Sequence, residues 1–331
     1  MRTRQFIYLD KGALGFFLAN LPRGGGFDDA QERRDDLWRC FKKMTFGSSA
    51  LVHLGYSKQE FFKEVQSSEY LQILWQHTHT AGNLVEFYFD GESFPNNGEK
   101  IKETDVVALS SLFFISNTEA VESFHNKGIN IITPETFYKQ SIERYGCDSR
   151  VPSFRKGEKA SWNFLKKVRS FFNSMIIADL YIHDSMDTNL LRILDCLLPK
   201  SLDNIDFHLT VFTHEADRSI TEVFQKINTF LREKRPNLSC KLSVFRAGKN
   251  DFHSRSIITN QIWMDNNGGF DLIDKEGIAK KTASISLWHP FASNKKVAEY
   301  NDSIDDVKKL FEKAIHCGEP VNRLFDLQSQ E

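Results

Sequence analysis

Two polar side chains suited to phosphate chemistry open an apolar segment in the last third of this 331-residue chain. In the stretch "DFHSRSIITNQIWMDNNGGFDLID", His253 and Arg255 are separated by one residue. Alternate residues of a strand point to the same face, so both side chains can address one phosphate. An imidazole can attack phosphorus or transfer a proton, and a guanidinium can bind two phosphate oxygens. Gly268 and Gly269 add a place where backbone can approach an anion.

This segment, with the strands before it, resembles the phospholipase D superfamily, whose motif is a His, any residue, a Lys, four residues, an Asp and a glycine-rich turn. The likeness covers roughly residues 160 to 290 and maps these three positions onto His253, Arg255 and Asn260. The preceding "IIADLYIHD" is similar to the family's first core strand. Arg for Lys keeps the positive charge with a different geometry. Asn for Asp removes a carboxylate, so phosphate binding is a stronger expectation than catalysis.

The single copy of this motif has two further consequences. Family members with one copy pair two subunits to bring two histidines together, so the resemblance implies a homodimer. The alternative is a degenerate domain, in which His253 and Arg255 only form hydrogen bonds with a neighbouring loop.

A second set of candidate residues lies in the first half, where polar side chains end strands or begin helices. Asp10 ends "FIYLD", Glu60 lies in the first turn of a helix, Asp105 opens "TDVVALSSL" and Asn117 follows "FFIS". Carboxylate oxygens are the ligands that Mg²⁺ and Mn²⁺ prefer, and such a metal activates water and offsets charge on a phosphate. The alternative is that Asp10 and Asp105 cap helices or pair with nearby lysines.

The order of these residues resembles a PIN-like nuclease domain over about residues 4 to 142. The stretch "FFISNTEAVESFHNKGINIITPETF" carries most of the likeness. The resemblance implies a site for Mg²⁺ or Mn²⁺ made by Asp10, Glu60, Asp105 and Asn117. Asn117 replaces a frequent fourth Asp, and Glu119 is placed to compensate. The interval between Asp105 and Asn117 is short for the family.

A basic stretch near the middle of the chain is the third candidate. The residues that we expect to contact a nucleic-acid backbone are Arg155, Lys156, Lys159, Lys166 and Lys167. Phe154, Trp162 and Phe164 are interleaved with them and are suited to stacking on unpaired bases. The alternative is a solvated linker followed by a solvated helix face, because charge runs are usually of that kind.

Composition excludes several classes of protein. The net charge of −1 provides no global field for a polyanion, so nucleic-acid binding requires a local patch. The longest apolar runs are far shorter than a bilayer requires, and the first ten residues lack the core of a signal peptide. The five cysteines are scattered, which disfavours a disulfide framework or a zinc site. We therefore expect a cytoplasmic protein with no membrane partner.

Alternating strand and helix patterns predict an α/β protein with two domains. In the second domain the expected strands are "SMIIADLYI", "FHLTVFT", "CKLSVFR" and "RSIITNQIWM". We expect a PIN-like domain over 1–145, a basic linker over 146–160 and a phospholipase D-like domain over 161–331, with a mainly parallel sheet and flanking helices. Capping boxes are predicted at Ser57 with Glu60 and at Ser219 with Glu222. Pro236 is expected to end the helix that Ser219 begins.

These features together predict a nuclease or nuclease-like protein that hydrolyses phosphodiester bonds of RNA or DNA. Such a pair of domains suits a bacterial toxin or a phage-defence effector, an inference from the domain types alone. The main alternative is a catalytically degenerate regulatory or assembly subunit of a larger complex, which Asn117 and Asn260 favour. A third possibility is that only the phospholipase D-like half is active, on a nucleic acid or a lipid head group.

Overall fold

The computed structural model divides the chain into two compact units. The described residues are 6–19, 50–55, 57–69, 71–72, 75–76, 85–89, 111–116, 118–119, 121–136, 153–168, 171–214, 219–248, 251, 255–288 and 294–326. The first unit comprises Met1–His125, Ile129–Asp148 and His289–Glu299, and the second comprises Asn126–Gly128, Ser149–Trp288 and Tyr300–Glu331. Each unit contains a sheet with helices, so the predicted α/β class is confirmed.

The first unit is built on a five-stranded parallel sheet of order β3-β2-β1-β4-β5. Its strands are β1 (Phe6–Asp10), β2 (Ala50–Leu54), β3 (Val85–Phe89), β4 (Ser111–Phe114) and β5 (Asn130–Ile132). The chain adds strands on one side of β1 and then crosses to the other side to form β4. In open parallel sheets, ligands bind outside the carboxyl ends of the strands at such a reversal.

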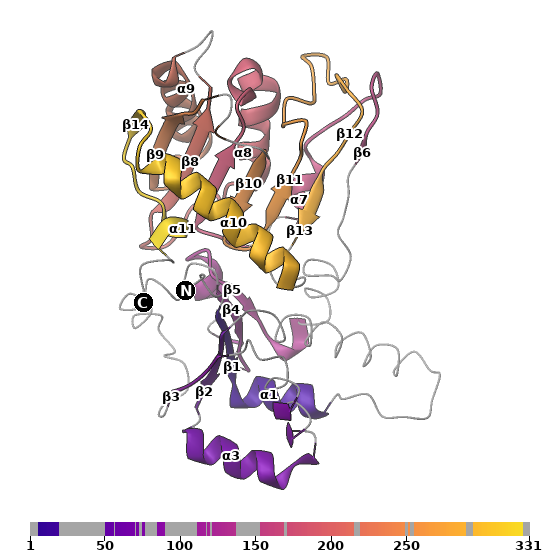
Figure 1. The fold of residues 1–331 in the computed structure, drawn as a ribbon, viewed down its shortest axis with the longest axis vertical. Coiled ribbons are helices and arrows are strands. Elements are labelled where there is room, and N and C mark those ends of the chain that lie inside the picture. The colour runs from indigo at the N-terminus through magenta and orange to yellow at the C-terminus, as the bar shows by residue number, and fades with distance from the viewer. Residues whose placement is uncertain are drawn as a thin grey trace. The chain divides into compact units, whose positions relative to one another are not determined.

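The helices described in the first unit begin close to strand ends (Figure 1). They are α1 (Lys11–Ala19), α3 (Lys58–Ser67) and α5 (Val121–His125). The capping box predicted for α3 is present, because Ser57 Oγ accepts from Glu60 N at 3.2 Å and Glu60 Oε2 accepts from Ser57 N at 3.0 Å. Local sequence therefore set the start of this helix.

The second unit contains a seven-stranded sheet of order β13-β11-β10-β7-β8-β9-β14. Its strands are β7 (Ser174–Ala178), β8 (Phe207–Thr213), β9 (Cys240–Arg246), β10 (Ser256–Thr259), β11 (Trp263–Asp265), β13 (Ser286–Trp288) and β14 (His316–Gly318). Neighbours β7, β8 and β9 are parallel, as expected from the βα units. The other four strands pair antiparallel with their neighbours, so the sheet is mixed.

The antiparallel part arises where the sequence pattern predicted one continuous strand. The segment "RSIITNQIWM" is instead a hairpin, with β10 and β11 joined by residues 260–262. A connection of that length cannot carry the crossover that parallel neighbours require, so the second arm must run antiparallel. The apolar run alone does not reveal this reversal, because both arms are buried.

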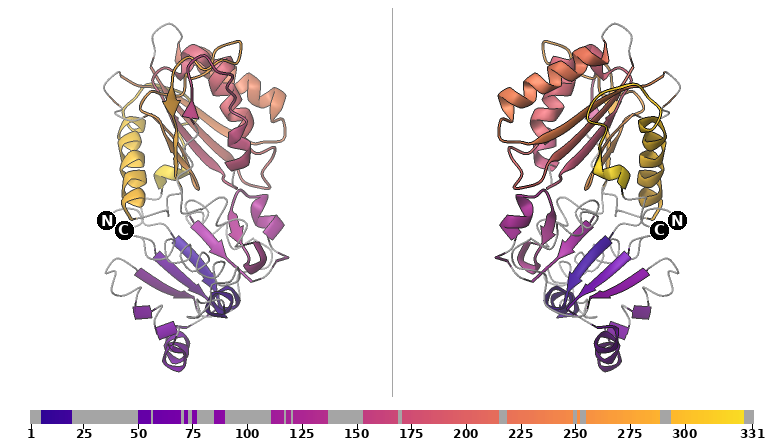
Figure 2. Two further views of the ribbon diagram at one scale, coloured as in Figure 1. Left: turned by 90° about the vertical axis from the view of Figure 1, so that its right-hand side faces the viewer. Right: turned by 90° about the vertical axis from the view of Figure 1, so that its left-hand side faces the viewer.

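Helices cover both faces of this sheet (Figure 2). On one side lie α8 (Leu191–Leu197) and α9 (Ile220–Lys234), and on the other lie α10 (Asn294–Phe311) and α11 (Arg323–Asp326). Ser219 Oγ caps α9 by accepting from Glu222 N at 3.3 Å, and α9 ends at Lys234, two residues before Pro236. Phe245 points to the second side, where its ring lies 4.7 Å from that of Phe311. None of the helices in the described parts of the chain is long and apolar enough to cross a bilayer.

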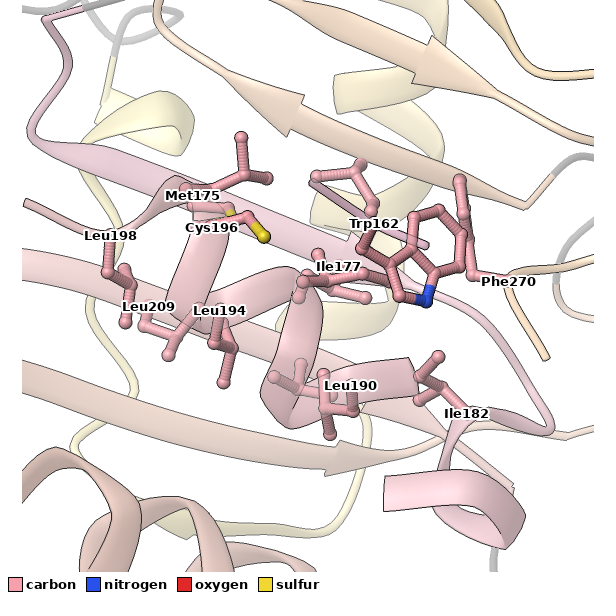
Figure 3. Close-up of a cluster of buried hydrophobic side chains, with 14 of the residues drawn as sticks. Trp162, Met175, Ile177, Ile182, Leu190, Leu194, Cys196, Leu198, Leu209 and Phe270 are labelled. Atoms are coloured by element: carbon pink, nitrogen blue, oxygen red, sulfur yellow. The ribbon is translucent and has the colours of Figure 1, made fainter. Parts of the chain in front are cut away.

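The core between the sheet and α8, of which Figure 3 shows a part with Trp162, includes residues from the predicted linker and its neighbourhood. Phe154 and Trp162 are buried there, with ring centroids 5.4 Å apart. Strand β6 (Ser153–Phe154) pairs with β12 (Ala283–Ser284), and Lys159 forms a bridge with Ile278. Residues 153–160 are therefore an integral part of the second unit rather than a linker, because burial of Phe154 requires that its backbone be paired.

Candidate functional site

The carboxyl end of β7 gathers the polar residues that form the candidate site of the second unit. Strand β10 runs antiparallel to β7, with Ser256 opposite Ala178. Arg255, immediately before β10, therefore lies beside Asp179, immediately after β7. The carboxyl ends of parallel strands are the usual location of ligand sites in α/β sheets.

Asp179 is a fully buried carboxylate held by backbone donors. Its Oδ2 accepts from Phe270 N at 2.6 Å, and its Oδ1 accepts from Tyr181 N at 3.0 Å. Burial raises the pKa of this carboxyl, while the two hydrogen bonds and the charges of Arg255 and Lys281 oppose that rise. A charge in such a place is tolerated because donors and a cation surround it.

Arg255 lies over this carboxylate with its guanidinium partly exposed. Its Nε is 3.8 Å from Asp179 Oδ1, and the side chain is 24% exposed. Nη1 donates to Asn267 O at 2.6 Å, and Cζ lies 5.2 Å from the centroid of the Tyr181 ring. These contacts set the orientation of the guanidinium. Its Nη2 makes no hydrogen bond with the residues that the structure describes, so donors remain for a ligand.

The glycine pair after β11 supports Arg255 rather than presenting backbone to an anion. Gly268 N donates to Asn266 Oδ1 at 3.0 Å, and Gly269 N donates to Asn266 O at 2.9 Å, so both N–H groups are used within the turn. Gly269 has φ +77°, and a Cβ there would lie 2.9 Å from Arg255 Cδ and 3.0 Å from Asp179 Oδ2. Glycine is needed here because the turn packs directly on the ion pair.

Two histidines continue the site along the carboxyl ends of β7 and β8. His183 is buried, and its Nδ1 lies 2.8 Å from Thr213 Oγ1. Its Nε2 is 3.0 Å from Asp184 Oδ1, without the alignment of a hydrogen bond. His214 Nδ1 lies 3.1 Å from Ala247 O. The edge therefore carries imidazoles as well as a guanidinium.

Asn260 lies at the opposite end of β10 from Arg255, which overturns its predicted place in a common catalytic site. It is fully buried, and its Oδ1 accepts from Asn173 N at 3.3 Å and from Ser174 N at 3.0 Å. Because β10 is antiparallel to β7, these contacts are at the amino end of β7. Asn260 anchors the start of that strand, and the motif spacing could not show that a hairpin turn begins there.

In the first unit, Asp10 lies at the point where the strand order reverses. Its Oδ1 accepts from Ala13 N at 2.7 Å, which caps α1. Its Oδ2 accepts from Ser116 N at 2.7 Å and from Ser116 Oγ at 3.0 Å. Ser116 follows β4, so this carboxylate joins the ends of β1 and β4. Asp10 therefore caps a helix, as the alternative interpretation of the sequence predicted. It does so at a place in the sheet where ligand sites are common.

The other predicted metal ligands are only partly within the described residues. Glu60 closes the capping box of α3, and hydrogen bonds from Ser57 lower the pKa of its carboxyl. The charge of Lys11, which follows Asp10, acts on Glu60 in the same direction. Asp105 and Asn117 lie outside the described residues, as does His253. Within the described ranges, no three His, Cys, Asp or Glu residues are grouped to hold a metal ion.

The basic residues of the predicted nucleic-acid contact are exposed, but their aromatic neighbours are not available for stacking. The exposed cations are Arg155, Lys156, Lys159, Lys166 and Lys167. Trp162 is 3% exposed, and its Nε1 donates to Asn189 Oδ1 at 3.0 Å. Phe154 is buried, and Phe164 packs against both rings. Trp162 and Phe154 belong to the core, since their large apolar area is more stable there than in water.

Sequence reasoning missed Asp179, Tyr181 and His183, although "IIADLYIHD" contains all three. The available signal was an Asp directly after a wholly apolar strand, which in an α/β sheet marks a carboxyl end. The pairing of Asp179 with Arg255 had no signal, because these residues are far apart in the sequence.

Comparisons with known proteins do not assign a function to this chain. No family model matches the chain, and no curated protein matches it. Among solved structures, the chain is similar to phosphatidylserine synthase of Haemophilus influenzae Rd KW20, with a TM-score of 0.30 and 10% sequence identity. That match covers 96% of this chain and 83% of the other. A TM-score of this size carries no argument about activity.

Proposed function

We propose that the second unit binds a phosphate group of a phosphodiester through Arg255, in a nuclease or nuclease-like protein. The observation that supports this proposal is the oriented, partly exposed guanidinium at the carboxyl edge. The ion pair with Asp179 and the contact with the Tyr181 ring fix the orientation of the Arg255 side chain. The side chain therefore loses less conformational entropy when a phosphate binds. Guanidinium is well suited to this ligand because it donates to two phosphate oxygens at once.

The same arrangement favours an anion over a cation. The carboxylate of Asp179 is fully buried, whereas the side chain of Arg255 is 24% exposed. A ligand at this edge therefore meets positive charge first. His253, two residues before Arg255 in the sequence, is the residue that we expect to attack the phosphorus or transfer a proton.

Hydrolysis of RNA or DNA in this proposal has two candidate centres with different requirements. A centre based on His253 needs no metal, so its activity would resist EDTA. The predicted Mg²⁺ or Mn²⁺ site at Asp10, Glu60, Asp105 and Asn117 would lose activity in EDTA. Dimerisation through the second unit stays a prediction of the phospholipase D-like resemblance.

Binding of a fluorescein-labelled single-stranded RNA and of the matching DNA, followed by anisotropy, tests the phosphate site. Arg255→Gln should weaken binding by about tenfold, because a charge-assisted contact is lost. Arg232→Gln, which removes an exposed cation on α9, is the matched control and should bind as the wild type does. Equal affinities for Arg255→Gln and wild type would contradict the proposal.

Cleavage of the same oligonucleotides, with and without EDTA, separates the two centres. EDTA-resistant cleavage that disappears in His253→Ala assigns the chemistry to the second unit. Mn²⁺-stimulated cleavage that disappears in Asp10→Asn assigns it to the first.

A non-catalytic assembly subunit is the second candidate function. The buried structural role of Asn260 favours it, because the motif position that would carry a carboxylate instead anchors β7. Binding that depends on Arg255 with no cleavage under any condition would select this candidate.

A further inference from the structure

A hollow of about 280 Å³ on the second unit is lined by buried apolar residues, here called its floor, and by exposed charged residues, here called its rim. Trp162, Ile273 and Cys196 line its floor, and all three are buried. Lys166 of α7 (Phe164–Val168), Arg192 of α8 and Lys275 stand on its rim, and all three are exposed. These residues come from three separate segments, so the hollow is a product of the fold.

The acidic residues of this hollow already have partners within the protein. Asp187 Oδ2 lies 2.5 Å from Lys226 Nζ, and Asp195 Oδ1 lies 3.1 Å from Arg235 Nη2. Asp274 Oδ1 accepts from two backbone N–H groups, those of residues 276 and 278, at 3.0 Å and 2.8 Å. Two of these three carboxylates are therefore paired with cations of the protein, and the third is held by backbone donors.

Unlike these acidic residues, the cations of the rim have no partner among the described residues. The side chains of Lys166, Arg192 and Lys275 form no salt bridge or hydrogen bond with any part of the chain that the structure describes. The positive charges of Lys166 and Arg192 both act on the Cys196 thiol, which places them around the same part of the floor. Three cations without partners around one hollow form a site for an anion.

We propose that this hollow binds the phosphate of a nucleotide, with the base or sugar on the apolar floor and the phosphate between the cations of the rim. The volume is near the lower end of the roughly 300–1,000 Å³ of small-ligand pockets. A single nucleotide, free or at the end of a strand, suits that size, and a duplex does not. Ser161, Asn163 and Thr188 add hydrogen-bonding groups for a sugar.

This site uses none of the residues around Arg255, so it stands apart from the proposed phosphate site at the carboxyl edge. In this site Lys166 would still bind a phosphate, as the sequence predicted, but Trp162 would not stack on an unpaired base. Its indole donates a hydrogen bond to Asn189, and only a small part of its surface is exposed at the floor of the hollow.

Isothermal titration calorimetry with adenosine 5′-monophosphate, adenosine and inorganic phosphate tests this site on the full chain. Adenosine 5′-monophosphate should bind more tightly than either of the others, because only it reaches both floor and rim. Arg192→Gln and Lys275→Gln should each weaken its binding by about three- to tenfold, and the double variant should weaken it further. Arg232→Gln is the matched control, and thermal melting shows that each variant is folded.

The outcomes distinguish this site from the one at Arg255. If Arg255→Gln weakens the binding of adenosine 5′-monophosphate while Arg192→Gln and Lys275→Gln do not, the nucleotide occupies the carboxyl edge and the hollow is not its site. Equal affinities for the nucleotide and inorganic phosphate would overturn the role of the floor. Undetectable binding at millimolar nucleotide would overturn the proposal altogether.

Competition by oligonucleotides identifies the source of the nucleotide. A 5′-phosphorylated oligonucleotide that displaces adenosine 5′-monophosphate, when its unphosphorylated counterpart does not, assigns the hollow to the end of a strand. Failure of both to compete assigns it to a free nucleotide.

Discussion

The two units place a carboxylate at the carboxyl end of a central strand, but they surround it differently. Asp10 of the first unit is half-buried, and its oxygens accept from backbone N–H groups and from the hydroxyl of Ser116. Asp179 of the second unit is fully buried and lies beneath the guanidinium of Arg255. Similar strand ends thus offer ligands opposite charges, a carboxylate in the first unit and a cation in the second.

This difference shows that a strand-end acid does not by itself define the chemistry of a sheet edge. Neutral donors around Asp10 leave its negative charge uncompensated within the described residues, which suits a cation. Because the Arg255 cation lies between Asp179 and solvent, the charge exposed at this sheet edge is positive, which suits a phosphate.

The largest effect is expected from replacing the two carboxylates with amides. Asp179→Asn should destabilise the second unit by about 3 kcal/mol, because it removes the negative charge beside Arg255 and places an amide NH₂ against a backbone donor. Asp10→Asn should cost only about 1 kcal/mol, because Asn also caps helices and the site is partly exposed. Urea unfolding of the two variants measures the difference. Equal losses would show that the two environments are energetically alike.

Gly269→Ala should destabilise the second unit by about 2 kcal/mol and also weaken phosphate binding. The new Cβ would crowd Arg255 and Asp179, in addition to the strain of a left-handed backbone. Gly157→Ala is the matched control, because Gly157 has φ +84° and nothing within 4 Å of a Cβ. It should cost about 1 kcal/mol and leave binding unchanged. Thermal melting measures both stabilities, and oligonucleotide anisotropy measures binding. Equally weakened binding in Gly157→Ala would show that crowding of Arg255 is not the cause of the loss in Gly269→Ala.

Acid should destabilise the second unit through His208. Burial, with a smaller contribution from Arg323, lowers the pKa of this imidazole to about 4, and its neutral Nδ1 accepts from Arg323 N at 3.1 Å. Below its unfolded value of about 6.5, the unfolded chain binds a proton that the folded chain does not, until the pH reaches about 4. Stability should therefore fall across this window, by about 1–2 kcal/mol after allowance for solvent screening.

The variant His208→Asn isolates this contribution, because it keeps an acceptor near Nδ1 and does not titrate. The raised pKa of Asp179 has the opposite effect, since its folded form binds the proton more readily and gains stability as pH falls. Urea unfolding at pH 7 and pH 5 should show a smaller loss in His208→Asn than in the wild type. An identical loss would exclude His208 as the source.

The smallest effects are expected from two glycines of α1. Gly15→Ala should stabilise the first unit by about 0.5–1 kcal/mol, because the position is open and alanine favours a helix. Gly12→Ala should instead be destabilising, since its Cβ would lie 2.5 Å from Ser116 Cβ and displace the partner of Asp10. Thermal melting distinguishes the two signs. A gain from both substitutions would show that the contact between Asp10 and Ser116 contributes little.

Local patterns were sufficient for several elements. The caps at Ser57 and Ser219 depend on residues three apart, and the helix that ends before Pro236 follows a clear period. The apolar strands that became β7, β8 and β9 were also predicted, and their βα connections implied parallel pairing. These features require only residues that are neighbours in the sequence.

Other predictions failed where partners distant in the sequence decide the outcome. Asn260 was placed in a site by motif spacing, but its contacts are with Asn173 and Ser174. Trp162 was expected to be a surface aromatic, yet residues from α8 and the turn at Phe270 cover it. Neither outcome can be read from composition or spacing.

Interactions between residues close in the sequence are enough to specify the α/β class, the helix caps and the position of Arg255 before an apolar strand. Contacts between distant segments are needed to specify that this strand is half of a hairpin, that Asp179 lies beside Arg255, and that Asn260 lies at the far end of the strand. The physical reason is that periodicity and capping depend on interactions within a few residues. The charge at a sheet edge depends instead on which strands become neighbours, and that is settled by burial of the whole core.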